Sequence, residues 1–565
     1  AALLRAIVRG VATFYETVST GFGELFSTSL RRVWALARLA MKEARRRRVE
    51  VALVVFLVIL AFANWFLSTD NQNPAKLYVS FVLTATTYLV LGVALVLSTF
   101  SLPSDFKTKT IYTVVTKPVY ASEIILGRIF GFTIVGTILL VLFAVSSYFF
   151  VTRSLSDTHR VEKDSLSYAK NNADEVIGYR GRTSLEAYHR HDVELDEDKD
   201  GAALSNYDHF HRIEADGDSF TVTESEGAIR ARLPKYGKLR FIDRQGVSKE
   251  RGINVGNEWT YRSFIDGGTQ ATAIWTFDGV DKSLDSGSGL PIGLIVRVFR
   301  THKGIIGQPI SGAIQIRNPE TKLKSDLMPF AALDNKIEEM VIKRKLLDIN
   351  GKERDLYEDF VSSTRQMEIR VQCLEPGQYF GFAQPDCYIR LPDAVAIFNY
   401  IKVYTSIWVQ MVIVIAIGVV ASSVLSGPVA MLFTVSFILL GFQRDFFVGI
   451  AAGDDYAKYG VEKVYGGGPV ESAYRMATQK NVMTDLTPGV GTSIINGVDF
   501  VLQKLMLGVS QVLPDFSQFS TVKFAAFGFD VPIEKVGADL TICLAYLVGA
   551  AVVGYFLLRT REVAR

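Results

Sequence analysis

Long apolar runs alternate with polar stretches along this chain. Six of the runs have about the 20 residues that a helix needs to cross the hydrocarbon core of a bilayer. The predicted spans are 49–67, 77–100, 129–151, 407–425, 429–447 and 540–558. A further helix with one apolar face is expected over 494–513, and we predict that it does not cross. The arginines after the last run belong on the inner side, and a second crossing after 447 would place them outside.

Basic residues give the direction of these spans. Four consecutive arginines, 45–48, precede the first span, and more cations lie between the second and third spans: Lys107, Lys109, Lys117 and Arg128. Such residues stay on the cytoplasmic side. Both termini are therefore predicted to be cytoplasmic.

The resulting organisation has four parts. Residues 1–48 form a cytoplasmic amphipathic segment, and 49–151 hold the first three spans with a cytoplasmic loop at 101–128. Residues 152–396 form an extracytoplasmic domain, and 397–565 hold the last three spans with an extracytoplasmic loop at 449–537. The lipid bilayer is thus the first predicted partner, with the chain crossing it several times.

The segment 152–396 has the period-two alternation of β-strands. Residues 367–373, for example, place Met367, Ile369, Val371 and Cys373 on one face. We therefore predict a polytopic α-helical membrane protein with six transmembrane helices and a large, mostly-β, sandwich-like domain inserted between helices three and four. Cys373 and Cys387 are both expected to point inward from neighbouring strands. A disulfide and two buried free thiols are both open interpretations.

The loop 101–128 has the pattern of a short helix lying across the inner membrane face. Pro103 and Pro118 are expected to break helix on either side of 107–116. Ser122 is expected to cap the next helix, with Glu123 in its first turn. A simple connector and an element that receives force from a soluble motor both fit this pattern.

The order of residues in this loop resembles that of ATP-binding-cassette transporter permeases of the exporter-like type-2 family. The matching positions are Asp105, Thr110, Lys117, Pro118, Val119, Glu123, Leu126, Gly127 and Arg128. The family usually has Glu and then Gly-Thr, where this chain has Asp105 and Lys109-Thr110.

The resemblance implies a function and its partners. The chain would be the permease subunit that moves a substrate across the cytoplasmic (inner) membrane of a bacterium. It would pair as a homodimer or heterodimer and be driven by a separate ATPase subunit that docks on the coupling helix. The implied contact residues are Lys107, Thr108, Lys109, Thr110, Tyr112, Lys117, Pro118, Glu123 and Arg128.

Composition and motifs narrow the classes of function that this chain could have. The 565 residues are 49% hydrophobic and 21% charged, which suits spans plus soluble parts, and a net charge of +3 favours no nucleic-acid partner. The phosphate-binding pattern Gly-x-x-x-x-Gly-Lys-Ser/Thr is absent from the sequence, so we expect no enzyme activity in this chain and ATP hydrolysis in a partner. The alternative is an anchored receptor or scaffold whose external domain binds a ligand or a partner protein, without transport.

Four of the six histidines form two His-x-His pairs, which are His189 with His191 and His209 with His211. A hairpin centred near Asp200 would set His189 opposite His211 and His191 opposite His209, with Cβ atoms about 5 Å apart. Four imidazoles so placed suit zinc, copper or nickel. Ordinary surface histidines on a polar hairpin and a pH sensor are the other interpretations, and no other cofactor is expected in this chain.

Overall fold

The computed structural model describes most of the chain. The described residues are 23–24, 27–67, 74–110, 119–155, 158–161, 166–170, 176–186, 190–195, 201–206, 209–216, 219–223, 229–255, 262–285, 289–301, 308–334, 336–459, 461, 464–482, 484 and 486–560. They divide into two compact units. Unit 1 comprises Ala1–Ala228, Ile397–Phe527 and Val531–Arg565, and unit 2 comprises Ile229–Ala396 with Gly528–Asp530.

Residues 152–396 are divided between the two units. The part before Ile229 groups with the helices, and Ile229–Ala396 belongs to unit 2. Unit 2 also includes Gly528–Asp530, a short segment that is distant in the sequence. The Arg232 backbone N–H donates to the Gly528 carbonyl (2.8 Å), and the Asp530 N–H donates to the Arg232 carbonyl (3.0 Å).

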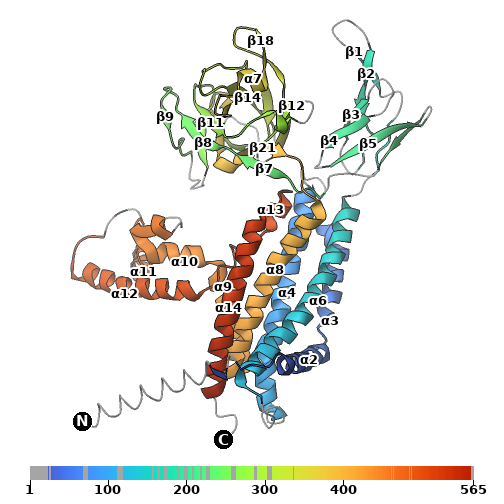
Figure 1. The fold of residues 1–565 in the computed structure, drawn as a ribbon. Helices are drawn as coiled ribbons and strands as arrows, with labels where there is room; N and C mark the ends of the chain where they lie inside the picture. The colour runs from blue at the N-terminus through green and yellow to red at the C-terminus, as the bar shows by residue number, and fades with distance from the viewer. Residues whose placement is uncertain are drawn as a thin grey trace. The chain divides into compact units, whose positions relative to one another are not determined.

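Apolar helices make up the bundle of unit 1 (Figure 1). They are α3 (Glu50–Phe66), α4 (Pro74–Lys107), α6 (Ala121–Ser154), α8 (Ala396–Val424), α9 (Gly427–Phe442) and α14 (Ile533–Thr560). Helix α10 (Arg444–Ala452) follows α9 and lies outside this bundle (Figure 1). In the described part of the chain, four helices are long and apolar enough to cross a membrane: α4, α6, α8 and α14. A fifth crossing is possible if α9 and α10, which meet at a bend of 68°, act as one broken span.

The expected first span is short. Helix α3 has 17 residues, and its apolar part is Glu50–Ala63, so it falls below the length of the other candidates. The described residues thus contain four or five candidate spans, whereas six were predicted.

Helix α8 is the most buried of the candidate spans, with 78% of its apolar window enclosed by the rest of the chain. Small residues let its neighbours come close. A Cβ on Gly418 would lie 2.0 Å from the Ser98 side chain of α4, and Trp408 donates its indole N–H to Thr137 of α6 (2.8 Å). Such small-residue contacts are typical of packing between helices in membranes.

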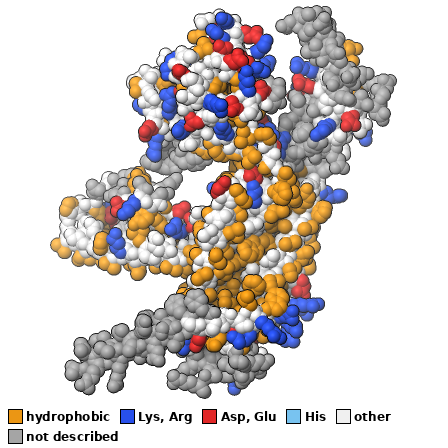
Figure 2. All heavy atoms as spheres, viewed as in Figure 1, with side chains coloured by type: hydrophobic (Ala, Val, Ile, Leu, Met, Phe, Trp, Pro, Cys, Tyr) orange, Lys and Arg blue, Asp and Glu red, His pale blue; other side chains and the backbone are white. Residues whose placement is uncertain are grey.

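The predicted helix over 494–513 is α12 (Val490–Val512), and it is not among the candidate spans. It packs with α10 and with α11 (Pro469–Thr478). The buried Asp499 carboxylate of α12 accepts the Val470 and Glu471 N–H groups (2.7 and 2.9 Å) and so caps α11. One face of α12 stays apolar and exposed, and Figure 2 shows hydrophobic side chains along it.

Unit 2 is mostly β. Its strands include β7 (Leu233–Tyr236), β8 (Lys238–Ile242), β9 (Ser248–Lys249), β10 (Ser263–Asp266), β11 (Thr272–Phe277), β12 (Gly289–Ile295), β13 (Arg297–Arg300), β14 (Ile310–Arg317), β15 (Met328–Ala332), β16 (Ile337–Lys343), β17 (Lys345–Leu347), β18 (Glu353–Asp355), β19 (Met367–Cys373), β20 (Gln378–Phe382) and β21 (Cys387–Leu391), with the short helix α7 at Leu356–Asp359. The main sheets have the orders β15-β14-β19-β11-β8-β9, β16-β12-β21-β7 and β10-β20-β13. Their inward side chains share one core around Trp275, Ile292 and Phe380. The strand predicted at 367–373 is β19, with the predicted bounds.

The two cysteines of unit 2 are free thiols, so the possible disulfide is not present. Cys373 ends β19 in the six-stranded sheet, and Cys387 begins β21 in the four-stranded sheet. Both side chains face the same core, but β19 and β21 belong to different sheets and do not pair with each other. The intervening strand β20 pairs with β10 and β13. Burial raises the pKa of the Cys373 thiol to about 12 and raises that of Cys387 as well.

These thiols should be unreactive in the folded protein. Because only the thiolate is nucleophilic, we expect no iodoacetamide labelling of Cys373 or Cys387 at pH 8 in the native chain and full labelling after denaturation. Electrophoretic mobility should not depend on reductant. Peptide mass spectrometry that finds a 373–387 linked pair in the non-reduced protein would contradict this result.

Candidate functional site

The region that resembles a coupling loop lies between α4 and α6. Helix α4 continues through Pro103 to Lys107, so the predicted helix break at Pro103 is wrong. A proline inside a helix removes one N–H donor, which transmembrane helices tolerate when neighbours supply other partners. The carbonyl that loses its backbone donor to Pro103 is that of Thr99; the next carbonyl, that of Phe100, accepts from the Arg47 guanidinium (3.1 Å).

The residues 107–110, at the end of α4 and directly after it, are exposed. Lys107, Thr108, Lys109 and Thr110 are all on the surface, and Lys109 has a positive φ of 60° that turns the chain after α4. The Thr108 hydroxyl contacts the Ser104 carbonyl (2.9 Å) and the Thr110 hydroxyl (2.7 Å). Tyr112, Lys117, Pro118 and most of the predicted helix over 107–116 lie outside the described residues.

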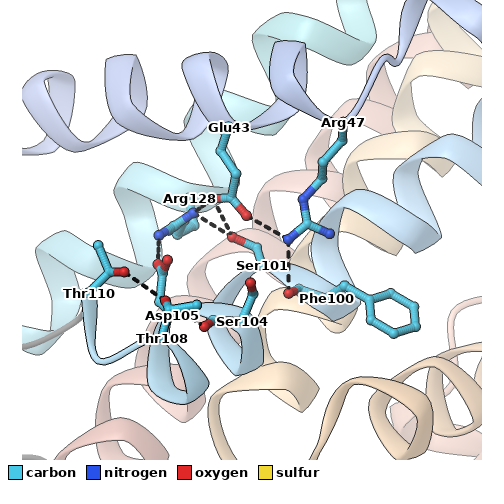
Figure 3. Close-up of polar contacts among 9 residues, drawn as sticks. All are labelled: Glu43, Arg47, Phe100, Ser101, Ser104, Asp105, Thr108, Thr110 and Arg128. Atoms are coloured by element: carbon cyan, nitrogen blue, oxygen red, sulfur yellow. Dashed lines mark hydrogen bonds and ion pairs between the residues drawn. The ribbon is translucent and has the colours of Figure 1, made fainter.

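The Arg128 side chain of α6 is the centre of a buried ionic network (Figure 3). With 6% of its surface exposed, it pairs with the Asp105 carboxylate of α4 and with the Glu43 carboxylate of α2 (Leu30–Arg46). Ser101 of α4 accepts from Arg128 and donates to Glu43 (3.0 Å). Arg47 reaches the other oxygen of Glu43 (2.8 Å). Two carboxylates and two guanidinium groups therefore connect three helices, so their charges balance within the network.

Glu123 forms a second junction, between the start of α6 and the start of α2. Its side chain is fully buried and accepts the N–H of Tyr120 (3.1 Å), which is the N-cap of α6. The observed cap lies two residues before the predicted cap, Ser122. The same carboxylate accepts the Ser29 N–H (2.8 Å) at the N-terminus of α2 and pairs with Arg32 (2.7 Å). The bond to Glu123 raises the pKa of Arg32 above its ordinary value. One carboxylate thus satisfies orphan donors of two helices.

Small residues bring α2 and α6 into contact between these two junctions. Ala37 and Ala40 of α2 are fully buried, and a Cβ on Gly131 of α6 would lie 2.6 Å from the Ala37 carbonyl and 2.7 Å from the Ala40 Cβ. Gly127 is equally close to Leu36. The glycines four residues apart follow the small-x-x-x-small spacing of close helix pairs.

Replacing Gly131 by valine should therefore push α2 away from α6. Overpacking of this kind costs about 1–3 kcal/mol, and we expect a lower melting temperature of the detergent-solubilised chain. Gly92→Val in α4 is the matched control, because a Cβ there has no neighbour within 4 Å. Equal melting temperatures for the two variants would contradict the close α2–α6 contact.

The histidine pairs lie in a separate, six-stranded antiparallel sheet of unit 1. Its strands are β1 (Ser167–Lys170), β2 (Val176–Arg182), β3 (Asp192–Leu195), β4 (Gly201–Asn206), β5 (His209–Asp216) and β6 (Ser219–Val222), and they pair in chain order. The predicted hairpin is wrong, because β4 lies between the two histidine pairs. It pairs with β3 on one side (Val193 with Ala203) and with β5 on the other (Ala203 with His211).

Three of the four predicted histidines nevertheless come together: His191, His209 and His211. The fourth member is His159, which follows α6, and His189 lies outside the described residues. All four clustered rings are buried, and their candidate ligand atoms lie within 4.8 Å of one another, so the cluster could hold a metal ion.

Sequence reasoning missed several of these residues. Glu43 and Ser101 complete the Arg128 network, but an acidic residue 85 positions from its partner leaves no local pattern. His159 stands alone in the sequence, so no spacing links it to the pairs. Searched against protein-family models and against curated proteins, the sequence matches none.

Proposed function

We propose that this chain is the membrane-spanning permease subunit of an ATP-driven transporter in the cytoplasmic membrane of a bacterium. The observation that carries the proposal is the buried network around Arg128. Two of the loop positions that resemble those of type-2 permeases, Asp105 and Arg128, form it together with Glu43. Glu123, another such position, makes the second buried junction.

The contacts between the helices suggest how a displacement of the loop would be transmitted to the bundle. The exposed residues from Lys107 to Thr110 extend directly from α4, whose last turns are held to α6 through Asp105 and Arg128. Helix α2 is held to α6 at both of its ends, by Glu123 and by Glu43. A displacement at the loop would therefore move α2, α4 and α6 as a unit. Closure of a docked ATPase would then bias a two-state bundle toward the state that opens an external path.

Retention of an ATPase tests this function. The full chain, purified with an affinity tag from its native membrane, should bring with it a protein that has a Walker A phosphate loop and hydrolyses ATP. Lys107→Glu combined with Lys109→Glu should reduce this retention at least tenfold, since both cations are exposed at the proposed contact. Lys343→Glu with Lys345→Glu is the matched control, because these lysines are exposed on unit 2.

Two outcomes would count against the permease. A full chain that carries no ATPase, while its β unit captures a ligand or partner protein, would support the anchored receptor or scaffold. An ATPase retained equally by both charge-reversed variants would place the contact elsewhere. The proposed assembly has two permease chains, identical or different, and two ATPase subunits, and nucleic acid has no part in it.

The proposed sidedness makes a separate prediction. A membrane-impermeant maleimide should label Ser248→Cys in intact cells, because Ser248 is exposed on unit 2, which we place outside. It should not label Ser104→Cys, at an exposed position near the end of α4, or Ser426→Cys, at the exposed turn before α9, because we place both positions inside. The three native thiols are buried and give little background. External labelling of Ser104→Cys would overturn this orientation and the placement of both termini in the cytoplasm.

A further inference from the structure

Three separate segments of the chain supply the four-histidine cluster, which has the geometry of a metal site. His159 lies in the segment 158–161, His191 immediately precedes β3, and His209 and His211 share one face of β5. Neighbouring rings lie 4.8 to 5.2 Å apart between centroids. Their exposed fractions are between 0% and 3%.

Backbone carbonyls orient two of these rings. The Nδ1 of His211 lies 2.8 Å from the Thr223 carbonyl, and the Nδ1 of His159 lies 3.0 Å from the Ser184 carbonyl. A carbonyl oxygen only accepts, so each Nδ1 carries the proton and each Nε2 presents its lone pair. Metal-binding histidines are held in this way, through a hydrogen bond from the other ring nitrogen.

The apolar core of this sheet is small. Its buried hydrophobic cluster among the described residues consists of Val161, Val193, Leu195 and Ile213. Three of these residues, Val161, Val193 and Ile213, lie two positions from a clustered histidine. Small domains with so little apolar burial are commonly stabilised by disulfides or by a structural metal, and the chain's three cysteines are all free and lie elsewhere.

We propose that His159, His191, His209 and His211 bind one zinc ion as a structural site. Four neutral imidazoles fill a tetrahedral shell and leave no open position, which is typical of structural rather than catalytic zinc. Zinc–nitrogen bonds of about 2.0–2.1 Å set ligand nitrogens about 3.4 Å apart. Small ring rotations from separations within 4.8 Å bring the four nitrogens to that distance. The ion would cross-link the segment after α6 to β3 and β5, independently of whether the chain transports anything.

The test measures metal in the full-length, detergent-solubilised chain. After dialysis against micromolar zinc and removal of loosely bound ions, we expect one equivalent of zinc. X-ray absorption at the zinc edge should show four nitrogen neighbours at about 2.0 Å with the scattering pattern of imidazole rings. His159→Ala should lower the retained zinc at least tenfold, and Glu194→Ala, at an exposed position of β3, should not change it.

The X-ray absorption spectrum is measured on the wild-type chain, so this part of the test does not depend on whether a variant folds. A wild-type chain that retains no zinc, or zinc bound mainly through sulfur or carboxylate oxygen, would overturn the proposal. So would a folded His159→Ala chain with wild-type zinc content. Copper that displaces equimolar zinc and gives a square-planar spectrum would overturn the choice of metal.

Discussion

Replacing Arg128 by methionine should destabilise the helix bundle by about 3–5 kcal/mol, the usual cost of removing one partner of a buried ion pair. The substitution leaves the Glu43 and Asp105 carboxylates, which are 20% and 18% exposed, without their shared guanidinium. Unfolding of the solubilised full chain in a denaturing detergent titration measures the effect. Arg46→Met, a change at an exposed arginine of α2, should have almost no effect.

A compensated variant separates charge imbalance from lost packing. Glu43→Gln with Asp105→Asn, added to Arg128→Met, removes the two unpaired charges, so we expect much of the lost stability to return. Neutral replacement of a whole buried network is often tolerated. A triple variant as unstable as Arg128→Met alone would mean that the guanidinium acts mainly through its packing, and would contradict the ionic account.

Replacing Glu123 by alanine should cost about 2–4 kcal/mol, because a buried charged acceptor with several donors is lost. The Ser29 and Tyr120 N–H groups would lose their cap, and Arg32 its partner. The start of α2 should then fray, which amide hydrogen exchange over residues 29–33 would report as faster exchange.

Glu123→Gln should have a smaller effect, because an amide oxygen still accepts one of these bonds. Glu50→Ala is the matched control, since Glu50 is also acidic and in a first helical turn but is exposed. Unchanged exchange at the start of α2 in Glu123→Ala would show that the carboxylate does not hold the two helices together.

Local patterns predicted the parts of this fold that depend on local order. The alternation at 367–373 predicted β19 because a strand buried on one face repeats every two residues. Glu123 lies in the first turn of its helix, as predicted, but the cap is Tyr120 and not Ser122. The continuation of α4 through Pro103 was missed, because a helix packed in an apolar bundle tolerates the loss of one backbone hydrogen bond.

Contacts between residues far apart in the sequence could not be predicted from local patterns. The symmetric spacing of the histidine pairs fitted one hairpin, but six residues, 201–206, form an extra strand between them. Their sequence, Gly-Ala-Ala-Leu-Ser-Asn, lacks the alternation that marks a strand. The predicted span 429–447 contains Gln443, Arg444 and Asp445, and the chain bends there between α9 and α10. A hydropathy profile gives the length of an apolar segment, but it does not give the direction of its helix in space.

Photocrosslinking from the loop is the most direct measurement of the proposed function. A photoreactive amino acid at position 109, illuminated in native membranes, should form an adduct with a protein that contains a Walker A motif. The same amino acid at position 343 on the β unit should not. If the ATPase co-purifies but crosslinks only to other surfaces, or if no ATPase is captured from position 109, the coupling of this loop to a motor is contradicted.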